Sequence, residues 1–135
     1  MEKERNRDRV LLYSQGVPRE IGDANAAERI IAEVVRLFTE ADDFYWKAVT
    51  ESDIEGFRRK GCVEVIFANP RALVVQAVKE TKTISKLLIP LDEAMCAHDA
   101  HIIYGNPEYD SFNLLLNSQG CGDLQELVQK ASPAK

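Results

Sequence analysis

The hydrophobic periodicity of this chain changes at Gly61, and this change constrains the fold more than any other feature of the sequence. Between Ala27 and Ala41, apolar residues recur at three- and four-residue steps, which is typical of a helix with one buried face. Between Cys62 and Leu116, β-branched and aromatic residues alternate or run together between turns, as they do in strands. Segregated runs of helix and strand predict an α+β fold rather than repeated βαβ units. We therefore expect N-terminal helices, an antiparallel β-meander of about five strands and a short C-terminal helix.

The first helix is predicted to begin at Asn25. Asn25 and Glu28 have the spacing of a capping box, in which each side chain accepts a hydrogen bond from the backbone of the other. On the polar face of this helix, Arg36 is placed to pair with Glu33 and with Glu40. The sequence therefore predicts one buried face and one solvated, ion-paired face.

A second, shorter helix is expected before Gly61. Ser52 and Glu55 repeat the capping-box spacing at its start. Three basic residues, 58–60, followed by Gly61 give a typical C-terminal end. The closing helix should start at Asp123, where another acidic residue follows three positions later, and stop before Pro133.

Strand boundaries follow from the turn residues between the apolar runs. A hairpin is predicted across Asn69–Arg71, because proline cannot donate to a strand ladder, and a second turn is predicted around Asn106-Pro107. A short strand is also expected near the N-terminus, followed by a loop over 14–22 that contains two glycines and a proline. The predicted strands are 9–13, 62–68, 72–78, 83–89, 100–104 and 111–116.

Length and composition fit a single domain over residues 1–135, with a flexible, mixed-charge N-terminal segment over 1–9. Neither a signal peptide nor an apolar run long enough to span a membrane is present, so we expect a soluble cytoplasmic protein without a membrane partner. The three cysteines are odd in number and widely spaced. This is unlike a disulfide framework and favours a reducing compartment.

The net charge of −5 argues against nucleic acid as a partner. Phosphate binding needs a basic patch, whereas the basic residues here are dispersed. Their densest run, 58–60, falls at a helix C-terminus, where cations complement the helix dipole.

The segment between the first two helices is the candidate partner-binding surface. It contains Asp42, Asp43, Phe44, Tyr45 and Trp46, so three aromatic residues directly follow two acidic ones. Three successive residues of a regular element cannot all face one core, and at least one ring should be exposed. Aromatic side chains with a polar group are enriched at protein interfaces, and surrounding charge tunes partner choice.

A second cluster offers metal-ligand side chains. Cys96, His98 and His101 lie within six positions and include both histidines of the chain. Such residues bind zinc, but only a loop would let all three converge, and no second ligand pair lies elsewhere in the sequence. The competing interpretation is a polar connection before the strand that begins near residue 100.

Cys121 lies between two glycines just before the last helix, where the helix dipole would lower the pKa of a thiol. The competing interpretation is a turn in which Cys121 fills a gap. Since phosphate loops, dinucleotide fingerprints and hydrolase motifs are missing from the sequence, we expect a non-catalytic, cofactor-free module that binds another protein. The alternatives are a small metal- or thiol-dependent enzyme or sensor using the Cys96/His98/His101 cluster, and a homo-oligomer formed through a sheet edge.

Overall fold

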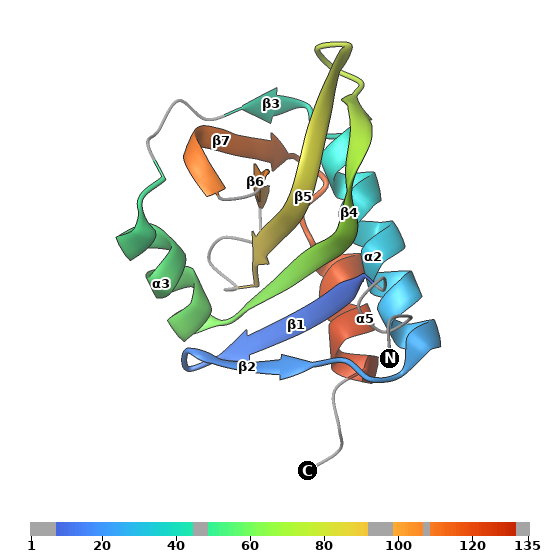
Figure 1. Ribbon diagram of the computed structural model, residues 1–135, viewed down its shortest axis with the longest axis vertical. Helices are drawn as coiled ribbons and strands as arrows, with labels where there is room; N and C mark the ends of the chain where they lie inside the picture. The colour runs from blue at the N-terminus through green and yellow to red at the C-terminus, as the bar shows by residue number, and fades with distance from the viewer. Residues whose placement is uncertain (1–7, 45–48, 92–98, 107–108, 132–135) are drawn as a thin grey trace.

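The computed structural model describes residues 8–44, 49–91, 99–106 and 109–131 (Figure 1). Within these ranges the fold is α+β, as expected, with helices α2, α3 and α5 and one antiparallel sheet. The helices are α2 (Ala24–Thr39), α3 (Glu51–Lys60) and α5 (Gly122–Ala131). The strands are β1 (Arg9–Ser14), β2 (Val17–Glu20), β3 (Asp43–Phe44), β4 (Cys62–Val75), β5 (Glu80–Pro90), β6 (Ala100–Gly105) and β7 (Tyr109–Asn117).

The sheet has seven strands in the order β2-β1-β4-β5-β6-β7-β3. The predicted meander is its centre, because β4, β5, β6 and β7 are neighbours both in sequence and in space. The hairpin of β1 and β2 joins one side of β4, with Arg9 opposite Ile66 and Tyr13 opposite Cys62. The two-residue strand β3 pairs with the end of β7 and forms the other edge.

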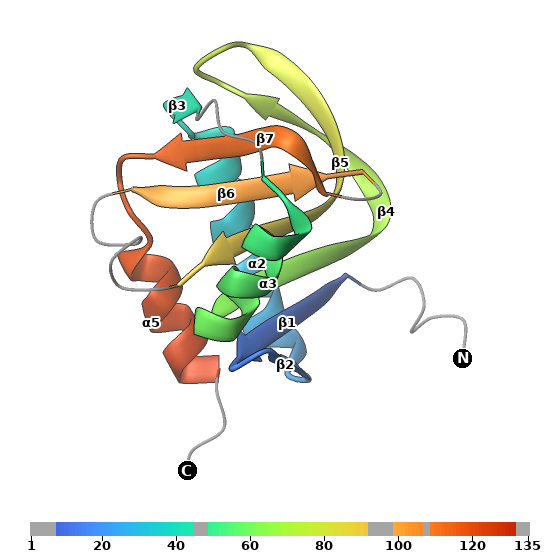
Figure 2. The same ribbon diagram turned by 90° about the vertical axis from the view of Figure 1, so that its left-hand side faces the viewer.

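Helices cover both faces of the sheet (Figures 1 and 2). On one face, α2 and α5 pack over the main core, to which β4 contributes Val63, Val65 and Phe67. On the other face, α3 covers a smaller cluster that contains Ile54 and Leu88. Side chains alternate across a strand, so the residues of β4 between the core positions point toward α3.

The helix α2 buries the apolar face that its periodicity predicts, including Val34 and Phe38. The predicted ion pairs are also confirmed, because Arg36 pairs with Glu33 and with Glu40. The predicted start was wrong. Asp23, not Asn25, caps the helix, and its Oδ1 accepts a hydrogen bond from the Asn25 amide at 3.0 Å. Aspartate and asparagine are about equally good caps, so the spacing to a later glutamate selected the wrong one.

The helix α3 ends at Gly61 as predicted but begins earlier than predicted. Thr50 is its cap and forms a complete capping box with Asp53. At the C-terminal end, Gly61 has a φ of 118°, which favours glycine, and its amide donates to the carbonyl of Phe57.

The hairpin predicted across Asn69–Arg71 was wrong. The segments 62–68 and 72–75 belong to one long strand, β4 (Cys62–Val75), whose pairing with β5 is interrupted between Ile66 and Arg71. The reversal lies at 76–79 instead, before β5. Proline is tolerated at such a bulge because the ladder is already interrupted there. The Asn69-Pro70 pair therefore bends the strand without ending it.

The number and order of elements also differ from the prediction at the N-terminus. The loop expected over 14–22 contains β2, which pairs with the predicted strand β1, so among the described residues two strands precede α2. Asp8, expected in a flexible segment, accepts a hydrogen bond from the Ala68 amide at 2.8 Å and pairs with Arg71. Among the described residues, no helix is long and apolar enough to cross a membrane.

Candidate functional site

The densest group of polar side chains surrounds a buried carboxylate beneath α3. Glu64 lies on β4 and is 2% exposed. Arg58 of α3 donates from one terminal nitrogen to both carboxylate oxygens, at 3.1 and 3.2 Å, and the Tyr109 hydroxyl donates to Oε2 at 2.6 Å. Tyr13 of β1 lies beside the same group, and its ring lies 4.8 Å from the Arg58 guanidinium carbon. This cluster thus connects α3 with three strands.

Burial and the negative charge of Glu64 together raise the pKa of three neighbouring side chains. Burial, reinforced by Glu64, raises the pKa of the Tyr109 hydroxyl and that of the Tyr13 hydroxyl above their ordinary values. The same two causes raise the pKa of the Cys62 thiol to about 12. All three groups are therefore protonated at neutral pH, and Cys62 is an unreactive buried thiol.

This arrangement stabilises the attachment of α3 and leaves Glu64 little capacity for catalysis. A carboxylate offers about four acceptor positions, and Arg58 and Tyr109 occupy three of them in a buried environment. A general base needs a free lone pair within reach of the proton that it removes. We interpret the Glu64 cluster, defined here as Tyr13, Arg58, Glu64 and Tyr109, as a structural brace between α3 and the sheet.

The described part of the predicted partner-binding segment, residues 42–44, lies at the edge of the sheet. Asp42 and Asp43 are both exposed, and Asp43 and Phe44 form β3, opposite Leu116 and Leu115 of β7. The remaining two predicted residues, Tyr45 and Trp46, lie outside the described residues.

Asp42 anchors this edge to the turn after β7. Its Oδ1 accepts from the Ser118 amide at 3.1 Å, its Oδ2 accepts from the Ser118 hydroxyl, and its own amide donates to the carbonyl of Leu116 at 3.0 Å. The bonds from Ser118 lower the pKa of Asp42, because they stabilise the ionised carboxylate.

A pH-dependent contribution to stability follows from this lowered pKa. The contribution of Asp42 should be fully present above the pKa of an unfolded aspartate, about 3.9, and should be lost as the pH falls through the lower pKa of the folded state. In Asp42→Asn, the midpoint of thermal unfolding should therefore fall less steeply with acidification below about pH 5 than in the wild type. Circular dichroism melts across this range check the result. Glu55→Gln, which removes an exposed carboxylate from α3, should keep the wild-type slope, and an equal slope in Asp42→Asn would contradict the assignment.

The structure describes only one of the three predicted metal ligands. Cys96 and His98 lie outside the described residues, and His101 is half-buried on β6. Burial lowers the pKa of His101 below its ordinary value, with the nearby Asp99 opposing this effect. Within the described ranges, no three histidine, cysteine or acidic side chains are grouped closely enough to hold a metal ion. The cluster of Cys96, His98 and His101 stays a prediction.

The role considered for Cys121 as a reactive thiol was wrong, as was the expectation that the cysteines form no disulfide. Cys121 is disulfide-bonded and fully buried, and its Sγ lies 4.0 Å from the carbonyl oxygen of Pro90. A sulfur in a disulfide has no proton to lose, so the position before α5 does not produce a nucleophile. Wide spacing in the sequence does not prevent two cysteines from meeting in the fold.

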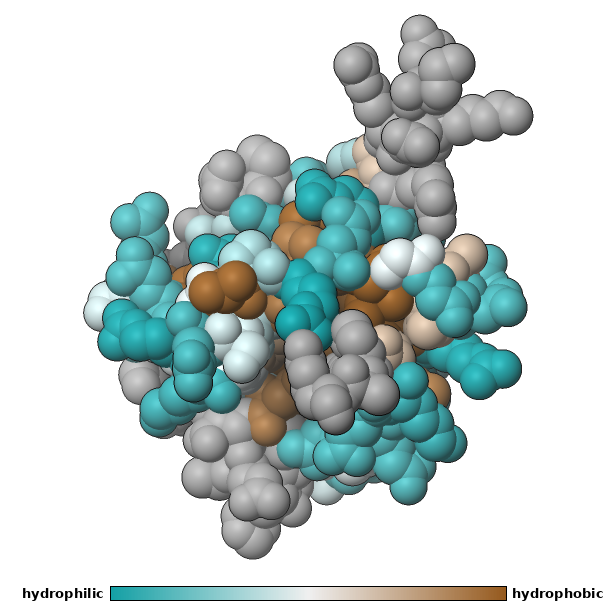
Figure 3. Space-filling view, turned by 90° about the horizontal axis from the view of Figure 1, so that it is seen from below, coloured by the Kyte–Doolittle hydropathy of each residue, from teal (hydrophilic) through white to brown (hydrophobic). Residues whose placement is uncertain are grey.

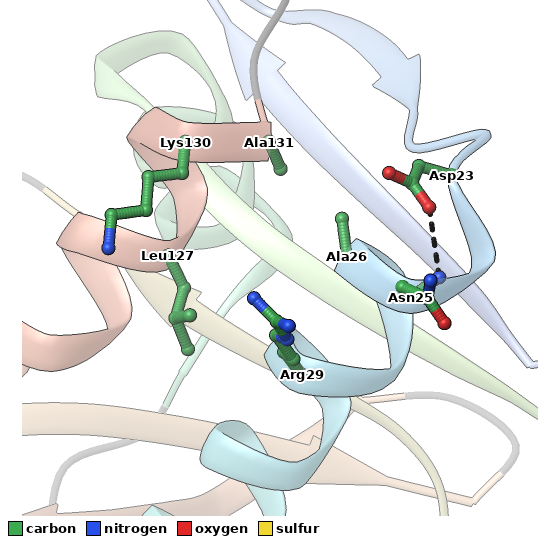
Figure 4. A pocket seen from close by; sticks show the side chains of 7 residues that line it. All are labelled: Asp23, Asn25, Ala26, Arg29, Leu127, Lys130 and Ala131. Atoms are coloured by element: carbon green, nitrogen blue, oxygen red, sulfur yellow. Dashed lines mark hydrogen bonds between the residues drawn. The ribbon is translucent and has the colours of Figure 1, made fainter.

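A pocket of about 310 Å³ lies between α2 and α5, and the sequence did not point to it (Figure 4). It is lined by Asp23, Asn25, Ala26, Arg29, Leu127, Lys130 and Ala131. These residues come from the first turns of one helix and the last turns of another, and their types are ordinary for helix surfaces. Only the packing of the two helices brings them together.

No model of a known protein family, no curated protein and no solved structure matches this chain.

Proposed function

We propose that the protein is a non-catalytic module that binds another protein, and that its contact surface consists of the sheet edge at β3 and the residues that follow it in sequence, Tyr45 and Trp46. The observation that carries the proposal is the position of β3 as the last strand at one edge of the sheet among the described residues. Sheet edges are a common place for a strand of another chain to dock.

Two further features support this edge as a contact surface. Asp42 is bonded to Ser118, so the start of the edge is held in place before any partner arrives. A preorganised surface loses less conformational entropy on binding. The acidic side chains of Asp42 and Asp43 are exposed beside the backbone edge, and the aromatic pair Tyr45-Trp46 follows directly in sequence. Charge beside an aromatic anchor is a common composition for a protein contact.

The opposite edge of the sheet is less suited to pairing with another chain. Its strand, β2, contains Pro18, which lacks an amide hydrogen. Edge strands that contain proline are typical of edges protected against association. The β2 edge therefore serves as an internal control for the β3 edge.

The proposal is tested with a variant at each edge. Partners captured from the native host by the wild-type chain would be identified by mass spectrometry, and the affinity of the purified partner would then be measured by calorimetry. Tyr45→Ala/Trp46→Ala should weaken binding by at least about tenfold, since aromatic anchors carry much of the energy of an interface. Val17→Ala/Arg19→Ala on β2 should bind like the wild type.

Each variant must keep the native circular dichroism spectrum for the comparison to count. Unchanged affinity in Tyr45→Ala/Trp46→Ala, or equal loss in both variants, would contradict the proposal. The same β3 edge is also the proposed site of self-association. Sedimentation of the wild type and of the Tyr45→Ala/Trp46→Ala variant distinguishes a second copy of the chain from a different protein as the partner.

A further inference from the structure

We propose that the pocket between α2 and α5 binds a small organic carboxylate with a short apolar body. This inference does not depend on the proposed function, because the pocket lies between the two helices on one face of the sheet and shares no residue with the β3 edge. Three properties of the described residues support it: the charge of the lining, the composition of the walls, and the size of the space.

The lining of the pocket is positively charged in an acidic protein. It contains two cations, Arg29 and Lys130, and one anion, Asp23, so its net charge is +1 while the whole chain carries −5. Neither cation forms an ion pair with a carboxylate of the described residues. The Asp23 carboxylate accepts a hydrogen bond from the Asn25 amide as the helix cap, which fixes its position (Figure 4). A monoanionic ligand would neutralise the remaining charge.

The helix α2 reinforces the preference for an anion. Its first turn contains no acidic side chain, so only the cap residue offsets the positive end of the helix dipole. Arg29, one turn further on, stands up from α2 into the space between the two helices (Figure 4). Its guanidinium can donate two parallel hydrogen bonds to one carboxylate.

Part of the pocket wall beside this charged group is apolar, while the larger share of the pocket surface is polar. Ala26 of α2 and Leu127 and Ala131 of α5 line it, all of them only partly buried. The pocket lies where α2 begins and α5 ends, and the view of the molecule from below shows hydrophobic surface exposed between hydrophilic residues (Figure 3). The volume of about 310 Å³ is at the lower end of the range for small-molecule sites. The ligand class that fits is therefore a compact carboxylate with a hydrocarbon part.

The test uses the full chain and hexanoate as the probe. Amide chemical shifts would be followed by NMR during titration with hexanoate, with hexylamine (also a six-carbon chain, with the opposite charge) and with inorganic phosphate, all at matched ionic strength. We expect saturable shifts with hexanoate at the first turn of α2 and the last turn of α5. Hexylamine and phosphate should each bind at least about tenfold more weakly.

Two double variants test whether hexanoate binding depends on the cations of the pocket or only on the total positive charge of the protein. Arg29→Ala/Lys130→Ala should weaken hexanoate binding by at least about tenfold. Arg19→Ala/Arg59→Ala removes two exposed cations outside the pocket, has the same net charge, and should bind like the wild type. All four substitutions are at exposed positions, so the fold should be retained. The absence of saturable binding, equal binding of hexylamine or phosphate, or unchanged affinity in Arg29→Ala/Lys130→Ala would overturn the proposal.

Discussion

Replacing Glu64 with leucine is expected to lower the free energy of unfolding by about 3–5 kcal/mol, the typical cost of removing one partner of a buried ion pair. The variant would leave the Arg58 guanidinium without its counter-charge and the Tyr109 hydroxyl without its acceptor. The Nε of Arg58 is already buried without a hydrogen-bond partner, so the loss of Glu64 would leave this guanidinium with still fewer partners. Urea unfolding followed by circular dichroism measures the loss.

The double variant Arg58→Leu/Glu64→Leu is the matched control for this result. It removes both charges, so no unpaired charge remains beneath α3, and it should be more stable than the single variant Glu64→Leu. A single variant that loses less than about 1 kcal/mol, or a double variant that is less stable than the single one, would contradict the role of the Glu64 cluster as a brace.

Replacing Phe38 with alanine is expected to cost about 3–5 kcal/mol, the usual range for a fully buried phenylalanine. Phe38 is completely buried on α2 and meets the ring of Tyr104 edge to face, with the ring centres 5.3 Å apart. Truncation removes this contact and leaves a cavity between the helix and the sheet. Because domains of this size are stable by only about 5–15 kcal/mol, the variant should unfold at a much lower urea concentration than the wild type.

The conservative variant Phe38→Leu keeps most of the apolar volume and should lose clearly less than Phe38→Ala. Arg29→Ala, which removes an exposed side chain from the same helix, should change the unfolding free energy by less than about 0.5 kcal/mol. Equal losses in the alanine and leucine variants at position 38 would show that packing at this site is not what holds α2 to the sheet.

The parts of the fold that were predictable are those fixed by local pattern. The buried face of α2, the end of α3 at Gly61 and the strands β6 and β7 follow from periodicity and turn residues over short stretches. The errors arise where a local signal had two structural meanings. Asn69-Pro70 has the composition of a turn, but only the pairing of β4 with β5 on both sides of it decides that the strand continues. Similarly, β2 is short and polar, and its pairing with β1 makes it a strand.

The site was harder to predict because its residues come from distant parts of the chain. The Glu64 cluster combines residues of β1, α3, β4 and β7, and no motif links their spacings. One signal was present: Glu64 is a lone charge inside the apolar run of β4, and buried charges are rare unless paired. The pocket between α2 and α5 gave no comparable signal, because a cation on the polar face of a helix is ordinary.

The pairing of β1 with β4 also determines when the hairpin of β1 and β2 can join the rest of the sheet. The second partner of β1 lies beyond β2, α2, β3 and α3 in sequence, whereas β4, β5 and β6 each pair with the strand that follows them. During synthesis the hairpin is made first, yet one side of β1 stays open until β4 has emerged. The strand also carries Val10 and Leu11, which are buried in the finished protein. A nascent chain that ends before Cys62 would therefore expose an unpaired strand edge, which favours association between such chains.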